Sequence, residues 1–321
     1  MEYFMTTESP LLGASDSQDI FNLLSQLPKQ ITWFEIELYQ WQGSWYWPPH
    51  LEAALAGQTF FEARDDDIII ASSLKAGTTW LKSLVPCIIN LPVDEDNDPL
   101  IKNNPHEVVS TLEIGVFQGK QNISILPSPR IFHTHLPYNS VPDAIKNSNC
   151  KIVYIARNPK DVFVSLWHFM NIFRTQEQGP FSMDKAFESF CNGVHSFGPN
   201  LDHVLEYWNK SLVLPQKILF LKYEELKLNP KEQVLKLASF LGKSLSNNEL
   251  DNILWRSSFE RLKNLDVNKS GNSSGFSIPN SSFFRLGTTG DWKNYFTPEM
   301  QERLDEIVRL KCEGSGLTLD I

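Results

Sequence analysis

The residues from Asp67 to Lys82, which read DIIIASSLKAGTTWLK, constrain the fold of this chain more than any other segment. They begin with a short apolar run typical of a buried strand, continue through a loop of small residues, and end in a helical pattern. In such a unit, free backbone N–H groups and the positive end of the helix dipole create an anion site. Lys75 adds a full charge, and Thr78 and Thr79 add hydroxyl donors. The segment predicts a phosphate-binding loop, although a tight turn with a helix cap would use the same residues.

The order of residues in this loop differs from that of a Walker A loop. In that motif, G-x-x-x-x-G-K-[ST], the lysine follows the second glycine. Here Lys75 precedes Gly77. We therefore interpret the strand–loop–helix as P-loop-like. Nucleotide-dependent phosphoryl transfer, which needs the Walker-type lysine and a magnesium carboxylate, is the disfavoured alternative.

Short apolar strands alternate with helical patterns along most of the chain. After the first strand and its helix at 77–90, the patterns predict strands at 130–135, 151–156 and 217–222, helices at 161–173, 187–208 (one or two), 231–241 and 299–311, and a loop at 94–104. This alternation predicts an α/β fold with a central, mostly parallel sheet flanked by helices. We see no internal repeat and no linker, so we expect a single domain over residues 20–321 after a polar, disordered segment at 1–19.

Composition narrows the class of protein. The chain has 321 residues, of which 41% are hydrophobic and 21% charged, and its formal net charge is −9. A general nucleic-acid binder would be basic, so we expect no nucleic acid as a partner. The four cysteines show no C-x-x-C spacing, which argues against a zinc site or a redox pair. The N-terminus lacks the pattern of a signal peptide, and no run of 18 apolar residues occurs, so we expect a cytoplasmic protein that does not enter the membrane.

An unusually aromatic segment lies between Trp33 and Trp47. It could cap an apolar pocket for a second ligand. It could equally pack an N-terminal segment onto the core. The sequence leaves both interpretations open.

Polar groups follow three of the predicted strands at the edge where ligands bind in parallel sheets. The first strand leads to Lys75, the second ends at His135, and the third ends at Arg157, which opens a helix containing Ser165. A lone histidine is often structural, but one opposite a phosphate loop is a candidate base, because its unperturbed pKa of about 6.5 lies near neutral pH. The planar fork of arginine suits a phosphate, although Arg157 alone could form a surface ion pair.

A segment near the C-terminus, 283–294, reads FFRLGTTGDWKN. It is rich in glycine and carries positive charge. Arg-x-Gly combined with Gly-Asp-Trp-Lys is unusual for a plain surface loop. We interpret it as a mobile loop that closes on a ligand.

These motifs together resemble the cytosolic sulfotransferases. The resemblance rests on four ordered motifs: K-x-G-T-T-W from Lys75, T-H-L-P from Thr134, R-N-P-K-D from Arg157 with Ser165, and R-x-G-x-x-G-D-W-K from Arg285. It extends from about residue 60 to the end. The aromatic N-terminal segment and the F-T-P-E-M run at 296–300 resemble the plant branch of the family.

The resemblance implies a donor, 3′-phosphoadenosine 5′-phosphosulfate (PAPS), with the product 3′-phosphoadenosine 5′-phosphate (PAP), and no metal. His135 would be the base, and Lys75 would neutralise charge on the leaving oxygen. The implied donor-binding residues are Lys75, Ala76, Gly77, Thr78, Thr79, Trp80, Arg157, Ser165, Tyr223, Ser257, Phe259, Phe284, Arg285, Leu286 and Gly287. The acceptor would be a hydroxyl of a small, largely apolar metabolite: a flavonoid, another phenolic, a steroid-like compound, a hydroxyjasmonate or a desulfoglucosinolate.

Four positions, in three motifs, depart from the family pattern. Leu74 and Ala76 flank Lys75 where the family usually has Pro and Ser, Thr or Cys. His133 replaces a lysine of many animal members, and Leu286 replaces the lysine of Arg-Lys-Gly. These changes predict weaker donor binding, and they keep open a PAP- or PAPS-binding protein with lost or reduced turnover. Pro298 breaks the animal dimer motif, so we expect a monomer.

Overall fold

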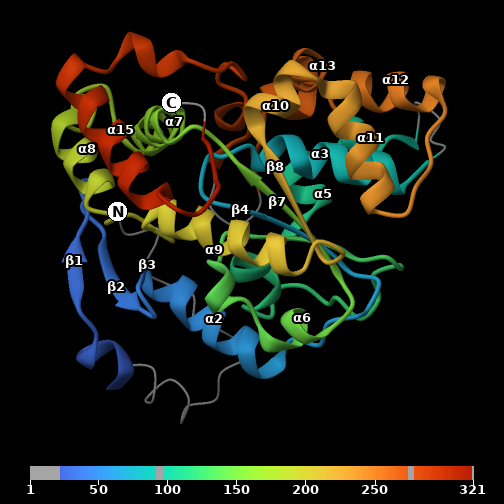
Figure 1. Cartoon of the computed structure of the whole chain (residues 1–321), viewed down its shortest axis with the longest axis horizontal. Coiled ribbons are helices and arrows are strands. Elements are labelled where there is room, and N and C mark those ends of the chain that lie inside the picture. The colour runs from blue at the N-terminus through green and yellow to red at the C-terminus, as the bar shows by residue number, and fades with distance from the viewer. Residues whose placement is uncertain (1–21, 92–96, 274–277, 320–321) are drawn as a thin grey trace.

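The computed structural model describes residues 22–91, 97–273 and 278–319. A parallel sheet of five strands forms the centre of this part of the chain (Figure 1). In spatial order the strands are β5 (Ser110–Thr111), β6 (Ile131–Thr134), β4 (Ile68–Ser72), β7 (Lys151–Ala156) and β8 (Ile218–Lys222). Each neighbouring pair is parallel, so the carboxyl ends of all five strands lie at one edge. The expected α/β class is confirmed. The segment predicted as disordered, 1–19, lies outside the described residues.

Helices cover both faces of the sheet, as Figure 1 shows. Successive side chains of a strand point to opposite faces. In β4, Ile69 and Ala71 pack on one face and Ile68 and Ile70 on the other, and all four are buried. The first face is covered by α2 (Pro48–Phe60), α6 (Asp143–Asn147) and α9 (Asn200–Val213), and the second by α3 (Thr78–Ile89), α11 (Pro230–Phe240) and α12 (Asn247–Arg256).

A third cluster of buried side chains packs α7 (Pro159–Met170) and α8 (Met183–Cys191) against α15 (Pro298–Cys312). The shorter helices are α4 (Pro99–Lys102), α5 (Pro105–Val108), α10 (Tyr223–Leu228), α13 (Phe259–Asn264) and α14 (Asp266–Lys269), and the segment after β5 forms a π-helical turn, η3 (Leu112–Val116). Two small antiparallel sheets complete the fold: β1 (Lys29–Ile31), β2 (Glu37–Trp41) and β3 (Ser44–Tyr46), and β9 (Asn272–Ser273) with β10 (Ile278–Pro279).

Local sequence explains where the main helices begin. The side chain of Asn158 accepts a hydrogen bond from the N–H of Lys160, and Pro159 occupies the first turn of α7. Thr297 and Pro298 start α15 in the same way. The cap at Asn158 and Pro159 fixes the point after β7 at which α7 begins. Arg157 therefore lies in the short loop between this strand and this helix.

The predicted strands and long helices are confirmed within a few residues. The prediction of a loop over 94–104 is wrong in part, because Asp98 accepts the N–H of Leu100 and starts α4. The β1–β3 sheet, α2 and α12 were not predicted. None of the described helices is long and apolar enough to cross a membrane.

Candidate active site

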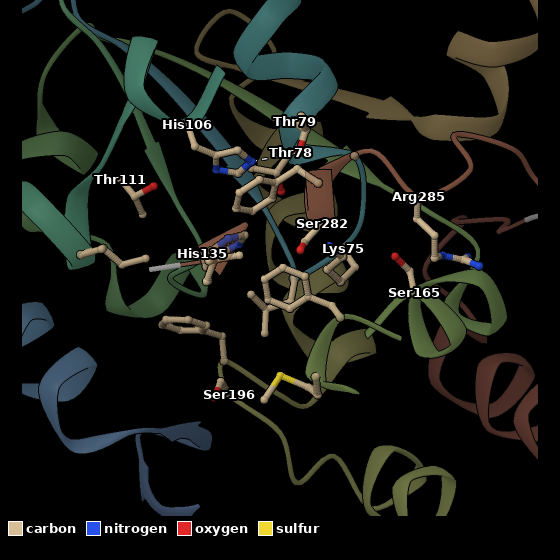
Figure 2. Close-up of a pocket in the computed structure, with 18 of the residues that line it drawn as sticks. Lys75, Thr78, Thr79, His106, Thr111, His135, Ser165, Ser196, Ser282 and Arg285 are labelled. Carbon is tan, nitrogen blue, oxygen red and sulfur yellow. Dashed lines mark hydrogen bonds between the residues drawn. The ribbon is translucent and has the colours of Figure 1, made fainter. Parts of the chain in front are cut away.

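A cavity of about 1600 Å³ opens at the carboxyl edge of the sheet. It brings together residues that directly follow β4, β6 and β7 with residues of the N-terminal sheet and of the segment after β10, and Figure 2 shows Lys75, His135 and Arg285 among them. All but one of the residues implied by the resemblance line it: His135, Lys75, Gly77, Thr78, Thr79, Trp80, Arg157, Ser165, Tyr223, Ser257, Phe259, Phe284, Arg285, Leu286 and Gly287. The exception is Ala76, which packs into the core beside α7 and can offer the cavity no side chain.

The loop between β4 and α3 has the geometry of an anion-binding loop. Lys75 has a φ of 64°, a left-handed conformation that is uncommon for a residue with a side chain. Gly77 has a φ of 120°, and a Cβ there would lie 2.9 Å from the ring of Tyr223. α3 begins at Thr78, and Trp80 and Leu81 make its first hydrogen bonds by donating to the carbonyl of Gly77, so the N–H groups of Thr78 and Thr79 have no partner within the helix. These N–H groups lie at the N-terminal end of α3, which is next to the cavity and is the positive end of the helix dipole.

Lys75 lies against an aromatic ring instead of a carboxylate. Its Nζ is 3.9 Å from the centroid of Phe169 in α7. Burial, with the positive charges of Arg157 and Arg285, lowers the pKa of Lys75 to about 7. An anion in the cavity would offset both effects and favour the charged ammonium.

His135 is held in one tautomer by the backbone. Its Nδ1 lies 2.9 Å from the carbonyl oxygen of Ser72, which can only accept a hydrogen bond. We therefore assign the proton to Nδ1, which leaves a lone pair on Nε2. Burial lowers the pKa of His135 to about 3, and the carbonyl of Ser72 only partly opposes this effect. The imidazole is thus neutral at physiological pH and able to accept a proton.

A buried carboxylate that sequence reasoning missed holds the turn containing His135. Glu113, in the π-helical turn η3, accepts the backbone N–H of His135 at 2.7 Å and the hydroxyl of Thr134 at 3.0 Å. Burial raises the pKa of Glu113 to about 7. A lone acidic residue in the apolar run LEIGV was the signal available in the sequence.

His133 lies behind the cavity wall and does not line the cavity. Its Nε2 is 3.3 Å from the hydroxyl of Ser72, which is 2.7 Å from the hydroxyl of Thr78. Its Nδ1 is 3.3 Å from Thr111 Oγ1, which accepts a hydrogen bond from the ammonium of Lys82 at 2.8 Å. Burial holds the pKa of His133 well below its usual value. A neutral hydrogen-bonded histidine therefore occupies the position where many animal members carry a lysine.

Arg157 connects the loop of Lys75 to the C-terminal segment. Its guanidinium donates to the carbonyl of Thr288 at 2.7 Å and stacks 4.5 Å from the ring centroid of Tyr223. It also forms an ion pair with Asp161 at 3.5 Å, so the alternative interpretation of an ion pair holds, although the arginine is buried and not at the surface. Its Nε is buried and meets no hydrogen-bond acceptor among the described residues. An anion in the cavity would supply one.

The segment from Arg285 to Gly290 lines the cavity through Arg285, Leu286, Gly287 and Thr288. Asp161 accepts the N–H groups of Gly290 and Trp292, and so anchors the segment to α7. Arg285 pairs with Asp291 at 2.7 Å. Gly287 has a φ of 64°, and a Cβ there would lie 2.5 Å from the ring of Phe259. The backbone therefore approaches Phe259 as closely as only glycine allows.

Both interpretations of the aromatic N-terminal segment have a counterpart in the structure. Trp45 and Tyr46 are buried in the core, whereas Phe34, Tyr39 and Trp47 line the cavity. The apolar and aromatic lining on this side continues through Ile36, His50, Ile114, Met170, Phe173, Phe181 and Phe197. The cavity thus has a cationic end near Lys75 and Arg157 and a largely aromatic and apolar end beside the N-terminal sheet, where Glu35, Glu37 and Arg174 also belong to the lining.

Comparison with known proteins agrees with this geometry. The profile of the family described as "Sulfotransferase domain" matches residues 65–316. The chain belongs to this family. The sulfotransferase is 42% identical over 319 residues to cytosolic sulfotransferase 13 of Arabidopsis thaliana, with 97% of each chain covered. It is 40% identical over 312 residues to cytosolic sulfotransferase 6 of the same plant, with 94% of this chain and 95% of the relative covered.

Solved structures of sulfotransferases share the fold. A sulphotransferase of Arabidopsis thaliana superposes with a TM-score of 0.77 at 36% identity, covering 96% of this chain and 98% of that one. A mouse sulfotransferase complexed with PAP gives a TM-score of 0.71 at 28% identity, covering 87% and 95%. This sulfotransferase is an enzyme that uses PAPS as donor and acts on small molecules. The buried Nε of Arg157 and the cationic loop at Lys75 fit an anionic nucleotide.

Proposed function

We propose that this enzyme transfers the sulfuryl group of PAPS to a hydroxyl of a small, largely apolar metabolite, with His135 as the base. One observation carries the proposal. The carbonyl of Ser72 fixes the Nδ1–H tautomer of His135, so Nε2 can accept a proton within the cavity that Lys75 also lines. An acceptor hydroxyl placed between them would lose its proton to Nε2 as it attacks.

The donor occupies the cationic end of the cavity in this proposal. PAPS supplies a sulfuryl group whose leaving oxygen belongs to the 5′-phosphate. The loop from Lys75 to Trp80 binds the 5′ end through its N–H groups, the ammonium and the two threonine hydroxyls. Arg157, Ser165, Arg285 and Gly287 hold the 3′-phosphate, and the buried Nε of Arg157 gains its acceptor there.

The adenine is placed by ring contacts. Six of the donor-binding candidates line this part of the cavity: Trp80, Tyr223, Ser257, Phe259, Phe284 and Leu286. Trp80 and Tyr223 meet edge to face with centroids 5.5 Å apart, and Phe259 lies 6.3 Å from Phe284. Ala76 contributes backbone alone, because its side chain is buried in the core.

The transfer step requires two groups at this site: a base for the acceptor proton and a positive charge beside the leaving oxygen. A bond forms between the acceptor oxygen and sulfur while the bond from sulfur to the bridging phosphate oxygen breaks. The acceptor proton passes to His135 Nε2, and the electron pair of the broken bond remains on the phosphate. Lys75 neutralises this charge, and preorganised help of this kind is often the largest catalytic contribution. The anionic donor also raises the pKa of His135 from its unliganded value, which makes it a stronger base.

The apolar end of the cavity defines the acceptor class. Aromatic and aliphatic side chains dominate there, and the histidine at position 50 is neutral, because burial lowers its pKa to about 4. Such a lining binds a flat or aliphatic body and leaves its hydroxyl near His135. Flavonoids, other phenolics, steroid-like compounds, hydroxyjasmonates and desulfoglucosinolates all fit this description. We further propose that the enzyme works as a cytoplasmic monomer without nucleic-acid or membrane partners.

A transfer assay with labelled PAPS tests the proposal. Wild type, His135→Ala and the control His195→Gln are compared on a panel of the five acceptor classes. His195 is also buried but lies outside the cavity lining. We expect the His135 variant to lose roughly 10²–10⁴-fold in rate, and the control to retain it. Normal turnover in His135→Ala would exclude this residue as the base. PAP binding without turnover on any acceptor would favour a binding protein with reduced activity.

A further inference from the structure

His106 is a cavity residue to which the proposed mechanism gives no role. It lies in the short helix α5, and its Nε2 is 2.9 Å from Thr79 Oγ1 in the donor loop. Figure 2 shows the imidazole of His106 directed at Thr79. The hydroxyl of Thr79, which lies at the proposed anion site, is thus also within hydrogen-bond distance of a histidine.

The ring of His106 is fixed from two further directions. It stacks on Phe283, with centroids 4.0 Å apart and planes inclined by 25°. Phe283 lines the cavity and lies two residues before Arg285. Asn104 and Glu107 form a capping box that starts α5, and the amide of Asn104 also donates to Asn268 at 2.8 Å. The imidazole is therefore held in place before any ligand arrives.

The direction of the hydrogen bond between His106 and Thr79 follows from the chemistry of the sulfuryl donor, PAPS. Phosphate and sulfuryl oxygens carry no proton and only accept. The hydroxyl of Thr79 has a single hydrogen, so it can donate to the 5′ group only if its bond with His106 runs the other way. The imidazole must then carry its proton on Nε2 and donate to Thr79 Oγ1.

A neutral imidazole suits this role. Burial, together with the nearby positive charges of Lys82 and Lys75, holds the pKa of His106 well below its usual value. A fixed N–H that donates to a hydroxyl makes that hydroxyl a stronger donor, because successive hydrogen bonds polarise one another.

We propose that His106 is a positioning residue for the donor: its Nε2–H donates to Thr79, so that the Thr79 hydroxyl is aimed at the 5′-phosphosulfate. This inference rests on the proposed function, because it assumes that the donor occupies the loop at Lys75. It assigns His106 no contact with the reacting atoms.

A double-mutant cycle on nucleotide binding tests the inference. His106→Phe keeps a ring to stack on Phe283, Thr79→Val removes the hydroxyl, and the double variant combines them. Calorimetry measures the affinity for PAP and for adenosine 3′-monophosphate, which lacks the 5′ group. Each single change should weaken PAP roughly tenfold, as expected for a hydrogen bond to a charged group. The double variant should be little weaker than either, and adenosine 3′-monophosphate should change less than about twofold, since it makes no contact through Thr79.

Two matched measurements separate positioning from a structural role. His106→Gln, whose amide can still donate, should recover part of the PAP affinity. Imidazole nitrogen-15 shifts of the PAP complex, assigned by comparison with that variant, should show the Nε2–H tautomer at His106. Three results would each overturn the inference. The losses of PAP affinity could multiply in the double variant, both nucleotides could lose affinity equally, or His106 could carry its proton on Nδ1. Wild-type protein that bound no PAP would overturn the proposed function itself, and this inference with it.

Discussion

At the scale of single residues, Lys75 shows how burial sets the charge of a functional group. Its ammonium lies on the ring of Phe169, and the burial that this packing imposes lowers its pKa to about 7. An anionic donor would stabilise the protonated form and raise that pKa. Donor binding is therefore coupled to proton uptake whenever the free enzyme has a neutral Lys75.

We expect the affinity for PAP to fall as the pH rises from 7 to 9. Above its free-state pKa, Lys75 must gain a proton on binding, so affinity should drop by up to about tenfold per pH unit. Lys75→Arg, which stays charged over this range, should flatten the profile, and Lys75→Met should bind weakly at every pH. Calorimetry at pH 7, 8 and 9 measures this. The same slope in wild type and Lys75→Arg would show that another group carries the proton.

Leu286 stands where the family pattern has a lysine, so the residues proposed to hold the 3′-phosphate carry one positive charge fewer. Its side chain is 44% exposed and lines the cavity next to Arg285. Leu286→Lys should raise the PAP affinity about two- to fivefold, the modest gain of a partly exposed ion pair, and the gain should shrink with added salt. Leu310→Lys, at an exposed site in α15, is the control for net charge. Unchanged affinity in Leu286→Lys would contradict the prediction.

At the scale of elements, the described segment 278–294 is held both through hydrogen bonds to its backbone and by buried side chains such as Phe284 and Trp292. It reaches the cavity through Gly287, while Asp161 anchors it at Gly290 and Trp292. Whether it moves to admit the donor, as its composition predicts, stays a prediction.

Gly287→Ala should disrupt this segment specifically. The added Cβ would lie 2.5 Å from the ring of Phe259, in a backbone conformation with a φ of 64° that favours glycine. We expect a loss of roughly 1–3 kcal/mol in stability and a clear drop in PAP affinity, measured by urea unfolding and calorimetry. Gly314→Ala has a similar φ of 73° but no atom within 4 Å, so it should leave PAP binding unchanged. Equal effects on PAP affinity in both variants would attribute the loss to backbone strain alone.

Elements outside the main sheet carried weaker sequence signals. The hairpin of β2 and β3 turns at Gln42 and Gly43, with φ values of 50° and 82°. Two positive φ values are typical of a two-residue hairpin, but glutamine is an uncommon first residue, and the flanking aromatic residues concealed the alternation. Pro48 opens α2, a helix whose buried face is mostly alanine and glycine and therefore gives little periodicity.

At the scale of the whole molecule, buried neutral histidines dominate the expected response to acid. Burial lowers the pKa of His50, His195 and His203 to about 4, lowers that of His135 to about 3, and holds the pKa values of His106 and His133 well below normal. In the unfolded chain these groups bind protons below about pH 6.5. The unfolded state therefore takes up more protons, and the free energy of unfolding falls with decreasing pH.

We expect stability to decline steeply from pH 6.5 towards pH 4. Urea unfolding across this range should give a slope that corresponds to several protons taken up on unfolding. Raised carboxyl pKa values, such as that of Glu113, act in the opposite direction between about pH 4.5 and 7 and reduce the slope. A flat profile between pH 6.5 and 4 would show that the histidines do not stay neutral in the folded protein.

The sequence by itself determined the parallel sheet, its helical cover and the strand-end residues Lys75, His135 and Arg157 of the cavity. It could do so because strand–loop–helix units of this kind place their functional residues at strand ends, and the spacing of such residues along the chain is local information. Only the tertiary structure decided that Ala76 faces the core, that His133 lies in a buried network with Lys82, and that Glu113 and His106 support His135 and Thr79. The hydrogen bonds of the His133 network join residues up to 61 positions apart, as between Ser72 and His133. Which face of an element meets which neighbour depends on how the whole core packs, and no local pattern contains that information.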